Sequence, residues 1–97
     1  MKRIHVEDRH LDIIRRILKG HGGAYVFGSR VSGKHRKFSD IDICFVRKGA
    51  VPLSEIGSLK NIFEESDLPF VVDITDYNAI SEEFQKIIDS TKVPFPY

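Results

Sequence analysis

Short β-prone runs alternate with amphipathic stretches along the chain, and glycine or proline separates most of them. Apolar residues recur at three- and four-residue spacing in three stretches, which predicts helices at 7–19, 53–63 and 80–88. Three runs rich in Val, Ile and Phe predict strands at 24–27, 41–47 and 70–75. The order helix, strand, strand, helix, strand, helix predicts an α/β (α+β) fold in which helices flank a small mixed sheet.

The remaining segments are predicted to be connections and one extended tail. Residues 30–39 are polar and basic, and we expect this connection to open with a short helix. Asn78 or Ser81 is expected to cap the last helix, because both side chains accept hydrogen bonds from backbone N–H groups. Two prolines favour an extended conformation for residues 91–97. This tail is predicted either to dock on a partner or to fray.

Length, charge and cysteine content limit the class of protein. A chain of 97 residues predicts a single domain over 1–97, with its core at about 8–90 and a tail at 91–97. The net charge is only +1, so we expect no specific nucleic acid partner and no attraction to an anionic membrane. Cys44 is the one cysteine, which excludes an internal disulfide. The charged first residues and the lack of a run of about 18 apolar residues predict a cytoplasmic protein without a signal peptide or membrane span.

Two aspartates, Asp40 and Asp42, interrupt the apolar run of the second predicted strand. Because side chains alternate along a strand, Asp40, Asp42 and Cys44 share one face, and the isoleucines and Phe45 between and after them share the other. A carboxylate in such a run is unfavourable unless it is paired, hydrogen-bonded or bound to a metal. Oxygen-only ligands suit Mg²⁺ or Mn²⁺. For this pair taken alone, the commoner explanation is a turn cap at Asp40 and an exposed sheet position at Asp42.

The surroundings of the pair make it more specific. Gly28-Ser29 ends the first predicted strand and precedes Asp40 by about ten residues, and Asp73 places a third carboxylate in a later apolar strand. Glycine lets the backbone approach a phosphate group without a Cβ in the way, and serine offers a hydroxyl or an N–H donor. The alternative for Asp73 is a turn or a salt bridge to a nearby Lys or Arg. The combination of the three parts is far more specific than any one of them.

In order and spacing these motifs resemble the DNA polymerase beta-like nucleotidyltransferase superfamily, whose signature is Gly-Ser, then Asp-x-Asp, then a later carboxylate. Two local sequences are most similar to those of minimal nucleotidyltransferase (MNT) domains, the antitoxin members of HEPN/MNT pairs. They are Phe-Gly-Ser-Arg-Val-Ser-Gly at 27–33 and Ser-Asp-Ile-Asp-Ile at 39–43. The resemblance covers about residues 8–90, because the order of predicted elements agrees as well. It implies a nucleotidyltransferase fold for the catalytic core.

The resemblance implies a role for each residue of the motifs. Asp40 and Asp42 are implied to hold two Mg²⁺ ions, with Mn²⁺ as an alternative, that bridge the phosphates of ATP. Asp73 is implied to complete the catalytic metal site and to help remove the proton from the acceptor hydroxyl. Gly28 and Ser29 are implied to contact the nucleoside triphosphate.

Two neighbouring residues are further candidates for contact with the nucleotide. Arg30 directly follows the Gly-Ser dipeptide and is the best candidate in a basic cluster that continues through Lys34, Arg36 and Lys37. The alternative is a solvated loop of ordinary charges. Ser39 directly precedes the first aspartate and is a candidate to orient its carboxylate, or else a plain turn residue.

The implied reaction transfers a nucleoside monophosphate, AMP from ATP, to an acceptor hydroxyl and releases pyrophosphate. In the MNT group the implied acceptor is a tyrosine on a HEPN-domain toxin, which makes the MNT protein the antitoxin. Two alternatives stay open. One is a module that binds its partner or a nucleotide without transfer, and the other is a small-molecule transferase of the antibiotic-modifying type that acts as a homo-oligomer. Three carboxylates in apolar strands favour an enzyme.

Overall fold

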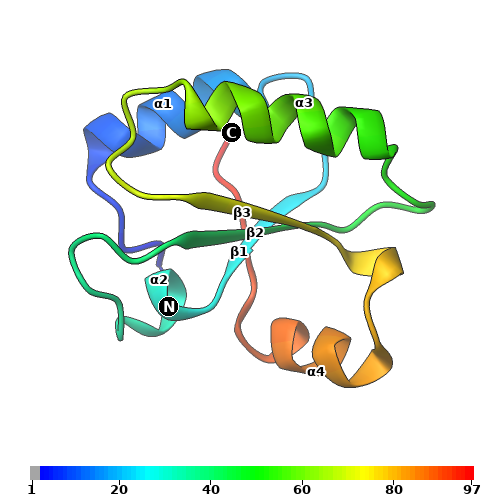
Figure 1. Cartoon of the computed structure of the whole chain (residues 1–97). Coiled ribbons are helices and arrows are strands. Elements are labelled where there is room, and N and C mark those ends of the chain that lie inside the picture. The colour runs from blue at the N-terminus through cyan, green and yellow to red at the C-terminus, as the bar shows by residue number, and fades with distance from the viewer. Residues whose placement is uncertain (1–2) are drawn as a thin grey trace.

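Four strands form one mixed sheet in the computed structural model, which describes residues 3–97 (Figure 1). The strands are β1 (Ala24–Phe27), β2 (Ile41–Phe45), β3 (Val72–Asp76) and β4 (Val93–Pro94). Their order across the sheet is β3-β2-β1-β4. β1 pairs antiparallel with both β2 and β4, whereas β2 and β3 run parallel. The predicted small mixed sheet is therefore confirmed.

Helices cover both faces of this sheet (Figure 1). α1 (Asp8–Leu18) and α3 (Leu53–Glu64) lie together on one face, and α4 (Glu82–Thr91) lies on the other. α3 also provides the crossover that two parallel strands require. Two short turns complete the chain, α2 (Ser29–Ser32) after β1 and the 3₁₀ turn η1 (Tyr77–Ala79) after β3. Within the described residues, no helix has the length and apolar character needed to cross a membrane.

The main core lies between the sheet and the layer formed by α1 and α3. Ile41, Ile43 and Phe45 of β2 all point into it and are fully buried. Cys44 points to the opposite face, where it packs with Ile88 of α4. This alternation confirms the predicted faces of the strand, although β2 ends at Phe45 rather than at residue 47. The side chains that alternate with the core residues of β2 therefore face the α4 side of the sheet.

The bounds of β3 differ from the predicted 70–75. Phe70 lies before the strand, and the guanidinium carbon of Arg30 is 4.6 Å from the centroid of its ring. At the other end Asp76 extends the strand and is buried. Its carboxylate accepts hydrogen bonds from the backbone N–H of Val51 at 2.9 Å and of Asn78 at 3.0 Å. Both ends of β3 thus carry contacts that the hydrophobic pattern did not predict.

Of the two candidate caps for the last helix, the structure selects one. The hydroxyl of Ser81 accepts a hydrogen bond from the backbone N–H of Phe84 at 3.2 Å, at the first turn of α4. Asn78 lies instead within η1, and its side-chain amide donates to the carbonyls of Arg47 and Gly49. The cap at Ser81 is the one that a serine directly before an acidic first turn favours.

The C-terminal segment is part of the fold. β4 pairs with β1, and the N–H of Phe95 donates to the carbonyl of Ala24 at 2.9 Å. Phe95 is 3% exposed and packs in the main core. The hydroxyl of Tyr97 accepts from the N–H of Ala24 at 3.2 Å and donates to the carbonyl of His21. The predicted extended conformation is confirmed at β4, and the alternative of fraying is wrong, because this segment pairs with β1 and places Phe95 in the core.

Candidate active site

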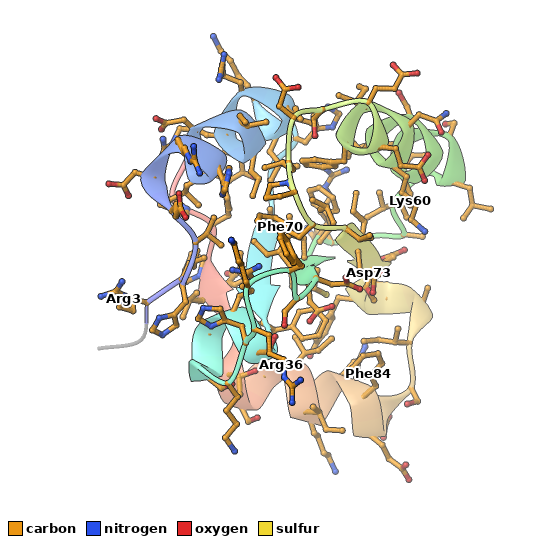
Figure 2. The ribbon with its side chains drawn as sticks, turned by 60° about the vertical axis from the view of Figure 1, so that its left-hand side comes forward. Arg3, Arg36, Lys60, Phe70, Asp73 and Phe84 are labelled. Atoms are coloured by element: carbon orange, nitrogen blue, oxygen red, sulfur yellow. The ribbon has the colours of Figure 1, made fainter. Side chains whose placement is uncertain are left out.

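The parallel pairing of β2 and β3 brings Asp42 and Asp73 side by side. The two residues are register partners, and neighbouring strands lie about 4.8 Å apart. Register partners point to the same face of a sheet, so both carboxylates lie on the α4 side. Asp40 lies directly before β2 and is exposed, as is Asp73, and Figure 2 shows Asp73 above Phe84 of α4. Two predicted carboxylates thus come from adjacent strands, with the third close by in sequence.

Burial and mutual repulsion define the electrostatics of this site. The pKa of the Asp42 carboxyl rises to about 6, first because burial removes water from it. The nearby charges of Asp73 and then Asp40 raise the pKa further. Asp42 therefore interacts electrostatically with both other carboxylates. A divalent cation beside such a group of oxygens stabilises their charged forms.

Gly28 holds the Gly-Ser turn directly against Asp42. Its φ of +80° and ψ of −151° belong to a region that residues with a Cβ essentially do not occupy. A Cβ at this position would lie 2.5 Å from Oδ2 of Asp42, which is far inside normal contact distance. Only glycine permits this approach. The structure therefore brings the predicted Gly28-Ser29 motif to the carboxylate pair, with Ser29 half-buried at the start of α2.

Arg30 faces the protein interior, whereas a phosphate ligand was expected at this position. The residue is 5% exposed. Its guanidinium donates to the carbonyl of Ser39 at 2.8 and 3.2 Å, to that of His5 at 3.1 Å and to that of Lys37 at 3.3 Å. Its other face stacks with the ring of Phe70. In this structure Arg30 braces the loop that leads into β2 and has little surface left for a phosphate.

Ser39 closes a turn in the same loop. Its hydroxyl accepts a hydrogen bond from the backbone N–H of Arg36 at 2.7 Å, which matches the alternative of a plain turn residue. The position of Arg30 directly after Ser29 did not predict where its side chain points, because successive side chains of a helical turn point about 100° apart. Ser29 and Arg30 therefore face different sides of α2. The exposed members of the basic cluster are Lys34, Arg36 and Lys37.

We expect Arg30→Met to lower the free energy of unfolding by about 2–4 kcal/mol, because it leaves several loop carbonyls without their charged donor. Urea unfolding measures this loss. Arg30→Lys keeps the charge but not the forked geometry, and it should recover less than half of the stability. If Arg30 instead binds the triphosphate, the Met variant will keep its stability and lose affinity for ATP.

The chemistry of the carboxylate group fits Mg²⁺. All of its ligand atoms are carboxylate oxygens, which this ion prefers. Among the residues that the structure describes, no three Asp, Glu, His or Cys side chains are arranged to hold a metal ion by themselves. At phosphate-transfer sites Mg²⁺ is commonly held by one or two carboxylates together with water and the phosphate oxygens of the substrate. We therefore expect Mg²⁺ and the triphosphate to bind together.

An apolar pocket that the sequence motifs did not reveal opens beside the third carboxylate. Its volume is about 540 Å³, and its lining includes Phe38, Lys60, Phe70, Val71 and Asp73. We call it the Asp73 pocket. Three of its lining residues, Lys60, Phe70 and Asp73, are labelled in Figure 2. The one available sequence signal was Phe38, a large apolar residue that stands alone at the end of a basic loop.

Comparisons with known proteins identify the family of this chain and agree with its fold. The family model described as "Polymerase beta, Nucleotidyltransferase" matches residues 12–94. A curated protein of Haemophilus influenzae, described as "Probable protein adenylyltransferase MntA", is 37% identical over 86 residues. The match covers 86% of this chain and 75% of that protein. The resemblance predicted from the motifs is thus confirmed at the level of sequence.

Two solved structures share the fold. The crystal structure of a toxin-antitoxin with AMP-PNP matches with a TM-score of 0.70 and 21% identity, over 89% of this chain and 72% of the solved one. The crystal structure of the toxin-antitoxin MntA-HepT matches with a TM-score of 0.63 and 17% identity, over 93% and 72%. Together with the family match over most of the chain, the mixed sheet and the Gly-Ser turn beside two strand carboxylates lead to one conclusion. This chain belongs to the polymerase beta nucleotidyltransferase family.

Proposed function

We propose that this protein is an antitoxin that transfers AMP from ATP to a tyrosine hydroxyl of a HEPN-type toxin. The observation that carries the proposal is the close approach of Gly28 to Asp42, with Asp73 as the strand neighbour of Asp42. A turn that admits phosphate lies there against a pair of carboxylates. Two comparisons support the finer points, because the Haemophilus influenzae relative is named a probable protein adenylyltransferase and one matching toxin-antitoxin structure contains AMP-PNP.

Each residue of the motifs has a proposed role. Asp40, Asp42 and Asp73 would hold Mg²⁺, as two ions, with Mn²⁺ as an alternative. When bound, the metal supplies stabilisation of the charge on the attacking and leaving oxygens. Gly28 leaves room for the triphosphate beside the carboxylates, and Ser29 offers its hydroxyl to the terminal phosphates. We place this reaction in the cytoplasm, where ATP is supplied, and in a single domain over residues 1–97.

The transfer step forms one P–O bond and breaks another. The tyrosine oxygen attacks the α-phosphorus of ATP while the bond from that phosphorus to the bridging oxygen of the β-phosphate breaks. Pyrophosphate leaves with the electron pair of the broken bond, and AMP remains on the tyrosine. Asp73 takes the proton of the hydroxyl and passes it to solvent, to which it is open.

The test uses ATP labelled with ³²P at either the α or the γ position, together with the purified HEPN-type toxin of the same host and Mg²⁺. We expect label from the α position on the toxin, none from the γ position, and no transfer in EDTA. Toxin that binds this protein tightly but receives no label would support a binding module without catalysis. Label on a small hydroxylated compound, with none on the toxin, would support the small-molecule transferase.

A further inference from the structure

The order of the strands separates a leaving-group side from an acceptor side. Gly28 follows β1, Asp42 lies on β2, and Asp73 lies on β3, which is the edge strand next to β2. In phosphoryl and nucleotidyl transfer the attacking and leaving oxygens lie roughly in line on opposite sides of the phosphorus. If the triphosphate tail lies at the Gly28-Ser29 turn, pyrophosphate leaves on the β1 side. The acceptor must then approach from the β3 side.

The Asp73 pocket lies at that edge of the sheet, where α3 meets the segment that leads into β3. Its lining combines Asp73 with seven apolar residues and with two further charged side chains, Lys60 and Glu64 of α3. Its volume of about 540 Å³ is within the range of about 300–1,000 Å³ that is common for ligand sites. Phe38 and Val71 contribute to the lining and are 62% and 63% exposed. A partner that covers these two side chains would remove a large apolar area from water.

The chemistry of the lining favours one kind of acceptor. A tyrosine side chain is apolar along its ring and carries one hydroxyl at its tip, so the ring can pack against Phe38 and Val71 while the hydroxyl meets Asp73. A serine side chain is too short to contact the apolar lining. A sugar-like acceptor with many hydroxyls would leave several of them without partners among apolar side chains, which is unfavourable.

We propose that the Asp73 pocket is the acceptor subsite and that a tyrosine side chain of the partner protein enters it, with its ring along Phe38 and Val71 and its hydroxyl at Asp73. This inference rests on the proposed function and adds the place where the acceptor binds and the two side chains, Phe38 and Val71, that position its ring. The C-terminal segment of the chain itself is not available as an occupant, because Phe95 is buried in the core and β4 is paired with β1.

The kinetic test uses N-acetyl-tyrosinamide and N-acetyl-serinamide as acceptors, with ATP and Mg²⁺. We expect kcat/KM for the tyrosine compound to exceed that for the serine compound by at least about tenfold. Val71→Asp and Phe38→Ala should each raise KM for N-acetyl-tyrosinamide by about tenfold and leave the Kd for ATP within about twofold. Ile87→Asp is the matched control, because Ile87 is 62% exposed on α4 and does not line the pocket.

A second measurement does not depend on transfer. N-acetyl-phenylalaninamide lacks the hydroxyl and therefore cannot accept AMP. In NMR spectra of the wild type it should shift the methyl signals of Val71 and Val72. In the Phe38→Ala variant the shift of the Val71 signals should be smaller.

The outcomes separate the subsite from the proposed function. If the wild type transfers AMP to the toxin and both variants keep the wild-type KM for that toxin, only the subsite is overturned. Loss of ATP affinity in step with the KM change would assign the pocket to the nucleotide instead. A wild type without any transfer would overturn the proposed function, and absence of the methyl shifts would overturn the pocket assignment independently.

Discussion

Replacing Asp42 with asparagine will abolish AMP transfer while leaving the fold intact. We expect the rate to fall by at least about 10³-fold, which corresponds to about 4 kcal/mol of transition-state stabilisation. Asparagine keeps the shape of the side chain but supplies a neutral oxygen where the proposed Mg²⁺ site requires a carboxylate. Transfer of α-labelled phosphate to the toxin measures the loss. Asp89→Asn, an exposed carboxylate change on α4, is the control and should leave the rate unchanged.

The same substitution will stabilise the metal-free protein at neutral pH. The pKa of Asp42 is about 6 in the folded protein against an ordinary value of 3.8, so the folded state binds this proton more tightly than the unfolded state does. Wild-type stability therefore falls as pH rises through the window from about 4 to about 6. An asparagine side chain at this position does not ionise, so the stability of the Asp42→Asn variant does not fall in this pH window.

We expect Asp42→Asn to gain about 1 kcal/mol at about pH 7.5 in EDTA, a modest value because the carboxylate is partly open to water. The gain should vanish below about pH 4, where Asp42 is protonated in both states. Urea unfolding of both proteins at the two pH values measures the difference. A variant that is less stable than wild type at both pH values would show that the Asp42 carboxylate is a structural hydrogen-bond partner rather than a repelled charge.

Replacing Gly28 with alanine will damage both stability and transfer. The residue combines a φ of +80° with the close approach of Asp42, so an added Cβ meets backbone strain and Oδ2 together. We expect the free energy of unfolding to fall by about 2–4 kcal/mol and the transfer rate to fall by about 10²-fold or more. Urea unfolding and the α-label assay measure the two effects.

A substitution at Gly20 serves as the control that separates the effect of backbone strain from the effect of the clash with Asp42. It has a φ of +86°, but a Cβ there would meet nothing within 4 Å. Gly20→Ala should therefore lose only about 1 kcal/mol and keep its activity. The double change Gly28→Ala/Asp42→Ala removes the clash and should recover part of the stability without recovering transfer. If Gly28→Ala resembles Gly20→Ala in both assays, Gly28 does not approach Asp42 as the structure shows.

The parts of the fold that depend on local patterns were predictable. The apolar residues at helical spacing predicted the three main helices, and the apolar run at 24–27 predicted β1. Alternation along 41–45 correctly predicted which face of β2 is buried. The adjacency of Asp42 and Asp73 was predictable only through the resemblance, because strand register is a long-range property that a single sequence does not specify. The family was confirmed, whereas the roles of Asp40, Asp42 and Asp73 stay predictions.

The parts that depend on tertiary contacts were not predictable. Arg30 looks like a phosphate ligand by its place after Ser29, yet it is buried, because the loop carbonyls and Phe70 surround it. Asp76 carries the same charge as Asp73 three residues earlier, but it is buried because two backbone N–H groups satisfy its carboxylate. The sequence places Phe95 in an extended tail, but in the structure its side chain packs in the main core.

The most direct test of the central claim is the intact mass of the HEPN-type toxin, purified together with wild-type protein and with Asp42→Asn. With wild type, we expect toxin that is heavier by one or more AMP groups, and peptide mapping should place them on tyrosine. With Asp42→Asn, we expect toxin of unmodified mass that still binds. Toxin that is neutralised but unmodified in both samples, or modified equally in both, would contradict the assignment of this site as a nucleotidyltransferase centre built on Asp42.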